Sequence, residues 1–285
     1  MTDRRLLASN GRTADAALKG QVDAERFVDP ARREVARTSW LCRDPSGPAD
    51  REVLFGDPFD VIEVQGDWTF GRAAKDGYVG WLPSDAIREA TMPTHWVSVR
   101  TTWAYGSPDF KTEPLCALHM TSRLAVTSVQ EGWAALEGGA FYVPVAHLKP
   151  ISDRTDRIEA ARAFLGTPYV WAGNSGFGLD CSGLVQVAMH AAGYACAADS
   201  DLQEMMPGQK LDADEPLVAG DLVFWKGHVA LATGPDTIIH ANAHHMMVIE
   251  ESVGRAVDRI AATDTGGVTS RLRPALRPFA PPIGR

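Results

Sequence analysis

A repeated strand pattern in the first half of the chain constrains the fold more than any other sequence feature. Gly66-Asp67-Trp68 is followed by Gly77-Tyr78-Val79-Gly80-Trp81-Leu82-Pro83, and Glu131-Gly132-Trp133 is followed by Gly139-Ala140-Phe141-Tyr142-Val143-Pro144. Runs rich in β-branched and aromatic residues, separated by Gly, Asp and Pro, surround both copies, as is typical of short strands. A unit of about 55 residues that occurs twice in this form predicts two small β-barrels.

The rest of the chain divides around these barrels. An Ala-, Arg- and Asp-rich leader precedes them and is expected to pack on them, with a short helix from Thr13 to Gly20. After them, Asp153 to Leu165 has helical spacing and strand-like runs follow later, so helices precede strands as in an α+β domain. The predicted parts are the leader at 1–35, the first barrel at 36–92, the second barrel at 93–150 and the α+β domain at 151–285.

The α+β domain contains a cysteine at a predicted helix start. Gly178-Leu179-Asp180-Cys181-Ser182-Gly183-Leu184-Val185 follows a Gly-rich loop and leads into an apolar run. Asp180 is a suitable N-cap, so Cys181 would lie in the first turn, where the partial positive charge of the helix end favours a thiolate. Cys181 is therefore a candidate nucleophile, although a lone helical cysteine is more often a buried apolar residue.

The same domain supplies candidate partners for this cysteine. A nucleophilic thiol needs a base, and the base needs a group that fixes its tautomer. Two strand-like runs that carry histidines are joined by Thr233-Gly234-Pro235-Asp236, which is typical of a hairpin turn. This hairpin would bring His228 and His240 close together, with His228 as the base and His240 as the orienting residue.

The histidines beyond this hairpin allow a second interpretation. His240, His244 and His245 lie close together in the sequence, and histidine clusters bind zinc and related metals. Neither a cysteine nor a carboxylate accompanies them at ligand spacing. We therefore expect neither a metal nor any other cofactor.

The overall charge and the remaining cysteines narrow the function classes. The net charge is −8 and no long basic stretch occurs, which argues against nucleic acid as a partner. No apolar run reaches about 18 residues, so no membrane span is expected.

Cys42, Cys116 and Cys196 have no CxxC spacing and are interpreted as small buried side chains in a reducing compartment. The N-terminus lacks the apolar core of a signal peptide, so we expect a cytoplasmic location, and a monomer is favoured.

Five motifs of the α+β domain occur in a fixed order: Gly166-Thr167-Pro168-Tyr169-Val170-Trp171-Ala172-Gly173, Leu179-Asp180-Cys181-Ser182-Gly183-Leu184-Val185, Gly220-Asp221-Leu222-Val223-Phe224-Trp225, His228-Val229-Ala230 and His240-Ala241. Together they resemble the NlpC-type family of papain-like cysteine peptidases, which cleave peptidoglycan peptides. The resemblance implies Cys181 as nucleophile, His228 as base and His240 as third residue. It also implies that Tyr169 and the backbone N–H of Cys181 stabilise the oxyanion.

The repeats in the first half resemble bacterial SH3-like domains, and their presence narrows the resemblance to a subgroup of γ-D-glutamyl-L-diamino acid endopeptidases. These enzymes release L-Ala-γ-D-Glu from murein-derived peptides whose third residue is diaminopimelate or lysine. The resemblance implies that Asp199 pairs with the free α-amine of L-Ala, because a desolvated ammonium needs an anionic partner. It further implies that Ser182 and Ser200 bind the D-Glu carboxylate and that Trp171 forms a wall of the pocket.

The resemblance also implies that the first barrel contributes a tyrosine and an acid to the amine site. Tyr78 matches the tyrosine, Glu52 is the preferred acid and Asp57 is its alternative. A site that demands a free amine would exclude intact stem peptides, whose amine is blocked as an amide.

The sequence departs from the family pattern at two places, and two other functions are also considered. Ala230-Leu231-Ala232 stands where Gly-Ile-Tyr is more usual, and the second barrel is degenerate, which makes a separate ligand role for it less expected. One alternative function is an amidase or thiol acyltransferase on another cell-wall amide. The other is a module that binds cell-wall peptides without cleaving them.

Overall fold

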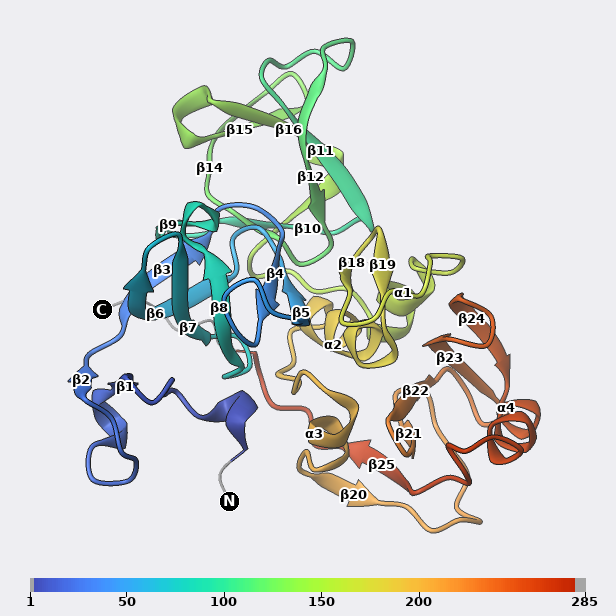
Figure 1. Ribbon diagram of the computed structural model, residues 1–285. Coiled ribbons are helices and arrows are strands. Elements are labelled where there is room, and N and C mark those ends of the chain that lie inside the picture. Colours follow the sequence, from blue (N-terminus) through green and yellow to red (C-terminus); the bar gives the residue numbers. More distant parts are fainter. Residues whose placement is uncertain (1–2, 280–285) are drawn as a thin grey trace. The chain divides into compact units, whose positions relative to one another are not determined.

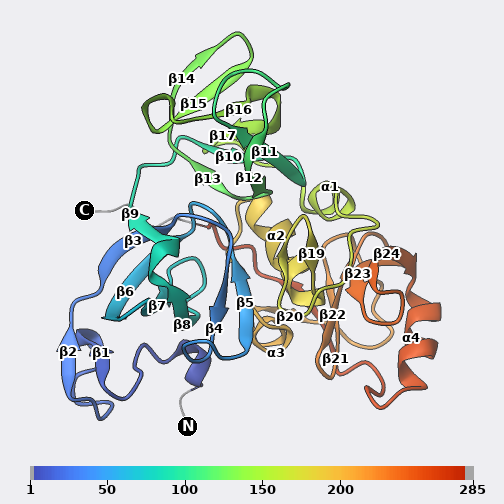
Figure 2. The ribbon, with the colours of Figure 1, turned by 45° about the horizontal axis from the view of Figure 1, so that its top comes forward.

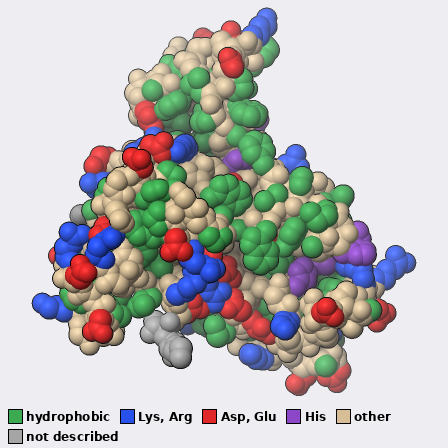
Figure 3. All heavy atoms as spheres, in the orientation of Figure 1, with side chains coloured by type: hydrophobic (Ala, Val, Ile, Leu, Met, Phe, Trp, Pro, Cys, Tyr) green, Lys and Arg blue, Asp and Glu red, His purple; other side chains and the backbone are tan. Residues whose placement is uncertain are grey.

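The computed structural model describes residues 3–279, which form two compact units, one ending at Asp153 and the other beginning at Arg154 (Figure 1). The first unit consists almost entirely of strands and the second combines a six-stranded sheet with helices, so the predicted α+β class is confirmed. Acidic and basic side chains are intermingled on the face drawn in Figure 3. Within residues 3–279, none of the helices is long and apolar enough to cross a membrane.

The first SH3-like region is one seven-stranded sheet with the order β5-β4-β8-β7-β6-β3-β9 (Figure 2). Its strands are β3 (Ala31–Val35), β4 (Ser39–Cys42), β5 (Ala49–Val53), β6 (Pro58–Gln65), β7 (Trp68–Ala73), β8 (Val79–Pro83) and β9 (Ile87–Glu89). Leu41, Phe59 and Leu82 are fully buried in its core. Because β3 pairs with β6 and β9, the region begins before position 36, the boundary that the sequence predicted.

The segment predicted as a second SH3-like barrel, named the second SH3-like region, is divided into a three-stranded sheet, β13-β10-β17, and a five-stranded sheet, β12-β11-β16-β15-β14. Its strands are β10 (His95–Val97), β11 (Thr101–Tyr105), β12 (Pro114–His119), β13 (Arg123–Leu124), β14 (Val126–Gln130), β15 (Trp133–Leu136), β16 (Phe141–Pro144) and β17 (Leu148–Pro150). Phe55 from the first region packs into its core with Val97, Leu118 and Leu136. The two regions of this unit therefore share buried apolar surface.

The repeat in the sequence corresponds to two matching hairpins. Two-residue loops, Gly66-Asp67 and Glu131-Gly132, each connect a glutamine that ends one strand to a tryptophan that begins the next. Gly66 has a φ of 57° and Gly132 has a φ of 83°, conformations that glycine adopts without a steric penalty. The 3-10 helices of this unit are η1 (Arg4–Leu6), η2 (Ala16–Leu18), η3 (Ser84–Ala86), η4 (Glu137–Gly139) and η5 (Val145–His147).

The leader forms short strands and turns, so the helix predicted from Thr13 to Gly20 is wrong. β1 (Thr13–Asp15) pairs in parallel with β2 (Arg26–Val28), and the single turn of η2 follows. Thr13 Oγ1 donates a hydrogen bond of 2.9 Å to Oε1 of Glu63 in the first SH3-like region. Packing against that region therefore overrides the helical propensity of the Ala-rich stretch.

The second unit is built on an antiparallel sheet with the order β20-β25-β21-β22-β23-β24. Its elements are α1 (Arg157–Arg162), β18 (Asn174–Ser175), β19 (Gly178–Leu179), α2 (Cys181–Ala191), α3 (Ser200–Glu204), β20 (Gly208–Lys210), β21 (Leu222–Trp225), β22 (His228–Ala232), β23 (Thr237–Asn242), β24 (Met247–Ser252), α4 (Val253–Ala261) and β25 (Ser270–Pro274). The strand-like runs expected after the helix are observed as β21 to β24. The helix expected from Asp153 is shorter, because Asp156 caps α1.

Helices cover the two sides of this sheet (Figure 2). α2 packs on β22, β23 and α1. On the other side, α4 packs its apolar residues against a core that includes Trp225, Ala230 and Ile238. Successive side chains of a strand point to opposite faces, so His228 shares the α4 face with Ala230, and His240 shares it with Ile238.

Candidate active site

Cys181 begins α2, and Asp180 caps that helix as predicted. Asp180 Oδ1 accepts hydrogen bonds from the N–H of Gly183 at 2.7 Å and from the hydroxyl of Ser182 at 2.9 Å. Its Oδ2 accepts a bond of 3.0 Å from the N–H of Ala172, which has a left-handed φ of 63°. One carboxylate therefore fixes both the first turn of α2 and the loop that precedes it.

Glycines allow that loop to approach the helix closely. A Cβ atom on Gly183 would lie 2.4 Å from the carbonyl oxygen of Gly173. A Cβ atom on Gly173 would lie 2.6 Å from the carbonyl oxygen of Gly178. Neither contact is possible for another residue without movement, so the Gly-rich stretch packs backbone against backbone beside Cys181.

The thiol of Cys181 is 6% exposed, and its pKa is raised to about 12. Burial is the main cause and the carboxylate of Asp180 adds to it, while the backbone N–H groups of Ser182 and Val229 oppose the shift. The expectation that the helix end produces a resting thiolate is therefore wrong, because loss of hydration outweighs the helix dipole. The resting sulfur is a neutral thiol beside the start of β22.

The β22–β23 hairpin brings His228 and His240 together, as the sequence predicted. Nε2 of His228 lies 2.8 Å from Nδ1 of His240, and the ring centroids are 5.0 Å apart. His240 is fully buried, and the ring of Trp225 lies 5.5 Å from that of His228. The hairpin can thus supply a base and its orienting neighbour.

Burial also sets the charge state of this pair. The pKa of His228 is lowered to about 3, mainly by burial and in addition by the nearby His240 and Arg259, while Glu251 opposes the shift. Burial likewise lowers the pKa of His240, and this effect outweighs the opposing carboxylate of Glu251. At neutral pH His228 is a neutral imidazole that can accept a proton, as a general base must.

Tyr169 lies beside the same helix start. Its backbone forms a bridge with Leu179, and its N–H donates to the carbonyl oxygen of Met246 at 2.9 Å. Burial raises the pKa of its phenol, and the proximity of Asp180 and of Cys181, which becomes negative when it ionises, raises it as well. The hydroxyl therefore stays protonated and can donate a hydrogen bond to a developing oxyanion.

Asp199 and Ser200, which the resemblance assigned to substrate binding, lie at the start of α3. Asp199 occupies the N-cap position, but its side chain makes no capping hydrogen bond. Its negative charge raises the pKa of Asp180, so the two carboxylates are electrostatic neighbours. Ser182 already donates its hydroxyl hydrogen to Asp180, and it must turn away from that residue to bind a substrate carboxylate.

A glutamine that the sequence did not single out joins these two helices. Gln203 is fully buried in α3, and its Nε2 donates to the carbonyl oxygens of Ser182 at 2.9 Å and Ala197 at 3.0 Å. The first turn of α2 is thereby tied to α3. A single glutamine in a polar stretch gives no signal of such a role before the fold is known.

Trp171 is 74% exposed, so it is not a core residue. Met246, whose carbonyl oxygen holds the backbone of Tyr169, is 57% exposed. Exposed apolar side chains therefore lie on and beside the Tyr169 segment of the second unit.

The residues predicted from the first barrel are both buried in the first unit. Tyr78 is 2% exposed, and the guanidinium of Arg51 lies 5.5 Å from its ring centroid. Asp57, the alternative acid, forms a buried ion pair of 2.6 Å with Lys75. Asp57 is therefore already paired with a cation, and Glu52 is 9% exposed.

The histidine cluster considered as a metal site does not assemble. Nδ1 of His245 lies 3.0 Å from Oδ1 of Asn242, and the ring of His244 packs edge-on against that of His245. Across the described part of the chain, no three His, Cys, Asp or Glu side chains are arranged to hold a metal ion.

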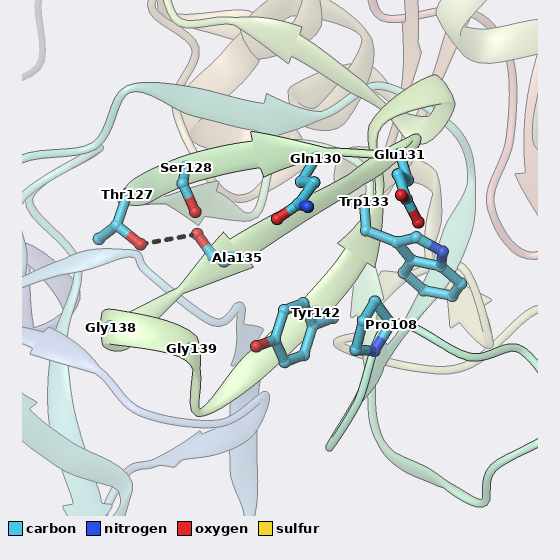
Figure 4. Close-up of a pocket in the computed structure, with 10 residues that line it drawn as sticks. All are labelled: Pro108, Thr127, Ser128, Gln130, Glu131, Trp133, Ala135, Gly138, Gly139 and Tyr142. Carbon is cyan, nitrogen blue, oxygen red and sulfur yellow. Dashed lines mark hydrogen bonds between the residues drawn. The ribbon is translucent and has the colours of Figure 1, made fainter.

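A separate pocket lies on the second SH3-like region, with a volume of about 340 Å³ (Figure 4). Trp133 and Tyr142 lie beside Pro108 at one end of it, and Gln130 and Glu131 line its edge. The residues that line the pocket include neither cysteine nor histidine. It can therefore bind a ligand, but it lacks the nucleophile and base found in the second unit.

Two family models match the chain. Residues 166–261 match the NlpC/P60 family, and residues 41–87 match the bacterial dipeptidyl-peptidase Sh3 domain. The first match contains Cys181, His228 and His240, and the second covers most of the first SH3-like region.

Curated relatives match most of the chain. The gamma-D-glutamyl-L-lysine dipeptidyl-peptidase of Bacillus cereus is 29% identical over 71% of this chain and 69% of its own length. The protein of the same name from Bacillus subtilis is 28% identical over 79% of each chain. Dipeptidyl-peptidase 6 of Lysinibacillus sphaericus is 29% identical over 67% of this chain and 79% of its own length.

A solved structure supports the fold. The crystal structure of an NlpC/P60 family protein from Bacillus cereus has a TM-score of 0.69 and 21% sequence identity to this chain. It covers 85% of this chain and 99% of the other.

A cysteine at a helix start, in an α+β unit that also presents a hydrogen-bonded pair of histidines, is the arrangement of the papain-like cysteine peptidases. More closely, the protein is an NlpC/P60 cysteine peptidase that carries an SH3 domain of the bacterial dipeptidyl-peptidase type. The family resemblance and the enzyme class expected from the sequence are thus confirmed.

Proposed function

We propose that this chain hydrolyses the bond between γ-D-Glu and the diamino acid in peptidoglycan stem peptides with a free N-terminal L-Ala, releasing L-Ala-γ-D-Glu. The observation that carries the proposal is the 2.8 Å contact between His228 and His240 in the unit that presents Cys181 at a helix start. The bond type is supported by the relatives, two of which are named gamma-D-glutamyl-L-lysine dipeptidyl-peptidase.

In the first half-reaction, the proton of the Cys181 thiol passes to His228 while the sulfur attacks the γ-carbonyl carbon of D-Glu. Because both resting groups are neutral, proton transfer accompanies attack. The π electrons move onto the carbonyl oxygen, and the N–H of Cys181 and the hydroxyl of Tyr169 stabilise the oxyanion. When this intermediate collapses, the C–N bond breaks, His228 protonates the departing α-amine, and a thioester remains.

In the second half-reaction, water attacks the thioester carbonyl carbon. His228 removes a proton from the water, and the same donors stabilise the second tetrahedral intermediate. Collapse breaks the C–S bond, the sulfur regains its proton from His228, and L-Ala-γ-D-Glu leaves as the free acid. The cycle consumes one water and needs no cofactor.

Substrate recognition in this proposal uses the residues around α3. Asp199 pairs with the α-ammonium of L-Ala, Ser200 and Ser182 bind the D-Glu carboxylate, and Trp171 covers the peptide. The charge of Asp199, felt at Asp180, supports a carboxylate near the nucleophile. Tyr78 and Glu52 complete the amine site by resemblance alone, so Tyr78→Phe and Glu52→Gln are expected to raise KM more than they lower kcat.

Two further parts of the proposal concern substrate and place. Lysine as the third residue is supported by the printed names of two relatives, and diaminopimelate remains the alternative. We place the reaction in the cytoplasm, where trimmed murein peptides with a free amine are recycled.

The test is hydrolysis of L-Ala-γ-D-Glu-L-Lys and L-Ala-γ-D-Glu-diaminopimelate, followed by mass spectrometry of the products. Release of L-Ala-γ-D-Glu is expected, and N-acetylation of the L-Ala should abolish it because the acetyl group removes the ammonium that Asp199 binds. Equal cleavage of the acetylated peptide would instead support an amidase of blocked stems. Tight binding without product would support a binding module.

A further inference from the structure

Polar contacts continue beyond the pair of His228 and His240. Nε2 of His240 lies 2.8 Å from Oε1 of Glu251 on β24. Arg259 of α4 binds both oxygens of that carboxylate, with Nη1 at 2.7 Å from Oε2 and Nη2 at 2.5 Å from Oε1. Four side chains from three strands and a helix therefore form one series, His228–His240–Glu251–Arg259. The strands and α4 bring these residues to the same face of the sheet.

We propose that Glu251 is a positioning residue that fixes the tautomers of both histidines, and that Arg259 holds Glu251 in the orientation this requires. The proposal rests on the proposed function, since it assigns Glu251 and Arg259 to the same catalytic base. Neither residue is assigned contact with the substrate or with the reacting atoms.

The protonation state of Glu251 sets the tautomers of both histidines. Burial opposes its ionisation, but hydrogen bonds from Arg259 and His240 hold its pKa at about 2, so the carboxylate only accepts hydrogen bonds. Nε2 of His240 must then carry the hydrogen that it shares with Glu251. Nδ1 of His240 is left with a lone pair, which must accept the hydrogen on Nε2 of His228. That leaves Nδ1 of His228 unprotonated and able to take the thiol proton.

Arg259 acts on Glu251 through both geometry and charge. A two-point contact between a guanidinium and a carboxylate fixes the plane of both groups. Arg259 also stabilises the negative charge of Glu251, which discourages transfer of a proton from His240 to the carboxylate. The series therefore orients the base, and it does not pass the proton onward.

The neighbouring residue on β24 supplies a matched control. Glu250 points to the opposite face of the strand and binds Arg162 in two places, with distances of 2.7 Å and 3.1 Å. Glu250→Ala thus removes a bidentate Arg–Glu pair from the same strand without touching either histidine. It reports what loss of a surface ion pair does to the strand itself.

The kinetic experiment compares Glu251→Ala, Glu251→Gln, Arg259→Met and Glu250→Ala. Glu251→Ala is expected to lower kcat by about 10- to 100-fold with little change in KM, as is usual when the partner of a functional imidazole is lost. Glu251→Gln should recover part of the loss, because its amide oxygen can accept from His240. Arg259→Met should lower kcat less than Glu251→Ala, and Glu250→Ala should leave kcat unchanged. Unaltered kcat in Glu251→Ala, or an equal loss in Glu250→Ala, would overturn the proposal.

Two readouts need no substrate and so separate this proposal from the proposed function. In ¹⁵N NMR spectra of the unaltered chain, both histidines should be protonated at Nε2, and Glu251→Ala should give His240 a mixture of tautomers. Alkylation of Cys181 by iodoacetamide should slow in Glu251→Ala and not in Glu250→Ala. A His240 protonated at Nδ1 in the unaltered chain would refute the tautomer assignment, even if the tripeptides are cleaved.

Discussion

The second unit and the second SH3-like region offer opposite kinds of candidate site. The peptidase unit holds a compact series of buried polar side chains, in which His240 is fully buried and touches both His228 and Glu251. The second SH3-like region has an open pocket with aromatic walls and a single carboxylate, Glu131 (Figure 4).

The comparison shows that the shape of a pocket indicates where a ligand can bind, whereas reactive side chains indicate where a bond can be broken. The open pocket has room for a ligand, but its side chains offer neither a nucleophile nor a base. The peptidase site is recognised by groups whose pKa values burial has moved, among them Cys181 upward and His228 downward. We therefore expect substitutions in the two places to have very different effects on turnover.

The largest effect is expected from the nucleophile and its base. Cys181→Ala and His228→Ala should each lower the rate of tripeptide hydrolysis by about 10⁴-fold or more, because each removes a group that forms or breaks a bond. Steady-state assays with calorimetric melting of the same samples check this. Turnover comparable to that of the unaltered chain would show that the substituted residue is not catalytic. A much lower melting temperature would show that the loss of activity is a folding defect.

The next effect concerns pH. A histidine with an ordinary pKa of about 6.5 would cost a general-base enzyme about 30-fold in rate at pH 5. The folded pKa of His228 is lowered to about 3 by burial, so its imidazole stays neutral far below pH 6.5. We expect kcat/KM to hold its value from pH 7 to pH 5, provided that melting curves show the chain folded. An acid limb centred near pH 6.5 would contradict the burial of His228.

A smaller effect is expected at the helix cap. Asp180→Ala should destabilise the fold by about 1 kcal/mol and lower kcat/KM by about 10-fold, because the first turn of α2 loses the carboxylate that fixes it. The pKa of the Cys181 thiol should fall at the same time, since Asp180 raises it. A pH series of iodoacetamide alkylation measures that pKa.

The control for the cap is Asp156→Ala. Asp156 caps α1 by accepting from the N–H groups of Ile158 at 2.8 Å and Glu159 at 3.2 Å. Its loss should cost a similar amount of stability and leave kcat/KM unchanged. Equal activity losses in the two variants would show that Asp180 acts through stability alone.

The smallest effect is expected in the second SH3-like region. Trp133→Ala and Tyr142→Ala should change tripeptide turnover by no more than about two-fold, the size of a 0.5 kcal/mol surface effect. Turnover assays with calorimetry check this. A large loss of kcat/KM in a variant that melts normally would show that the pocket contributes to the reaction. The pocket and the peptidase site would then not differ in their effect on turnover.

Much of the fold and part of the site followed from the sequence because local rules applied. Asp180 before an apolar run marked the cap of α2, and a four-residue turn between strand-like runs brought His228 and His240 together. Repeated Gly-containing loops before tryptophan marked the two SH3-like hairpins. Each of these signals lies within a few residues of the feature that it predicts.

Other features depend on contacts between distant segments, which local patterns do not reveal. Glu251 reaches His240 through the strand register, and Arg259 reaches Glu251 from α4, a helix that the sequence did not predict. The thiolate expected at Cys181 is contradicted, because the burial that raises the pKa of this thiol depends on the whole fold. The helix predicted from Thr13 failed for the same reason, since a parallel strand pair replaced it.

The most direct test of the account is to trap the acyl-enzyme. The chain is mixed with L-Ala-γ-D-Glu-L-Lys or the diaminopimelate peptide, quenched in acid, digested and mapped by mass spectrometry. The account predicts an L-Ala-γ-D-Glu thioester on the peptide that contains Cys181, and no such adduct with the N-acetylated substrate. Product release without a covalent adduct in Cys181→Ala, at the rate of the unaltered chain, would contradict it.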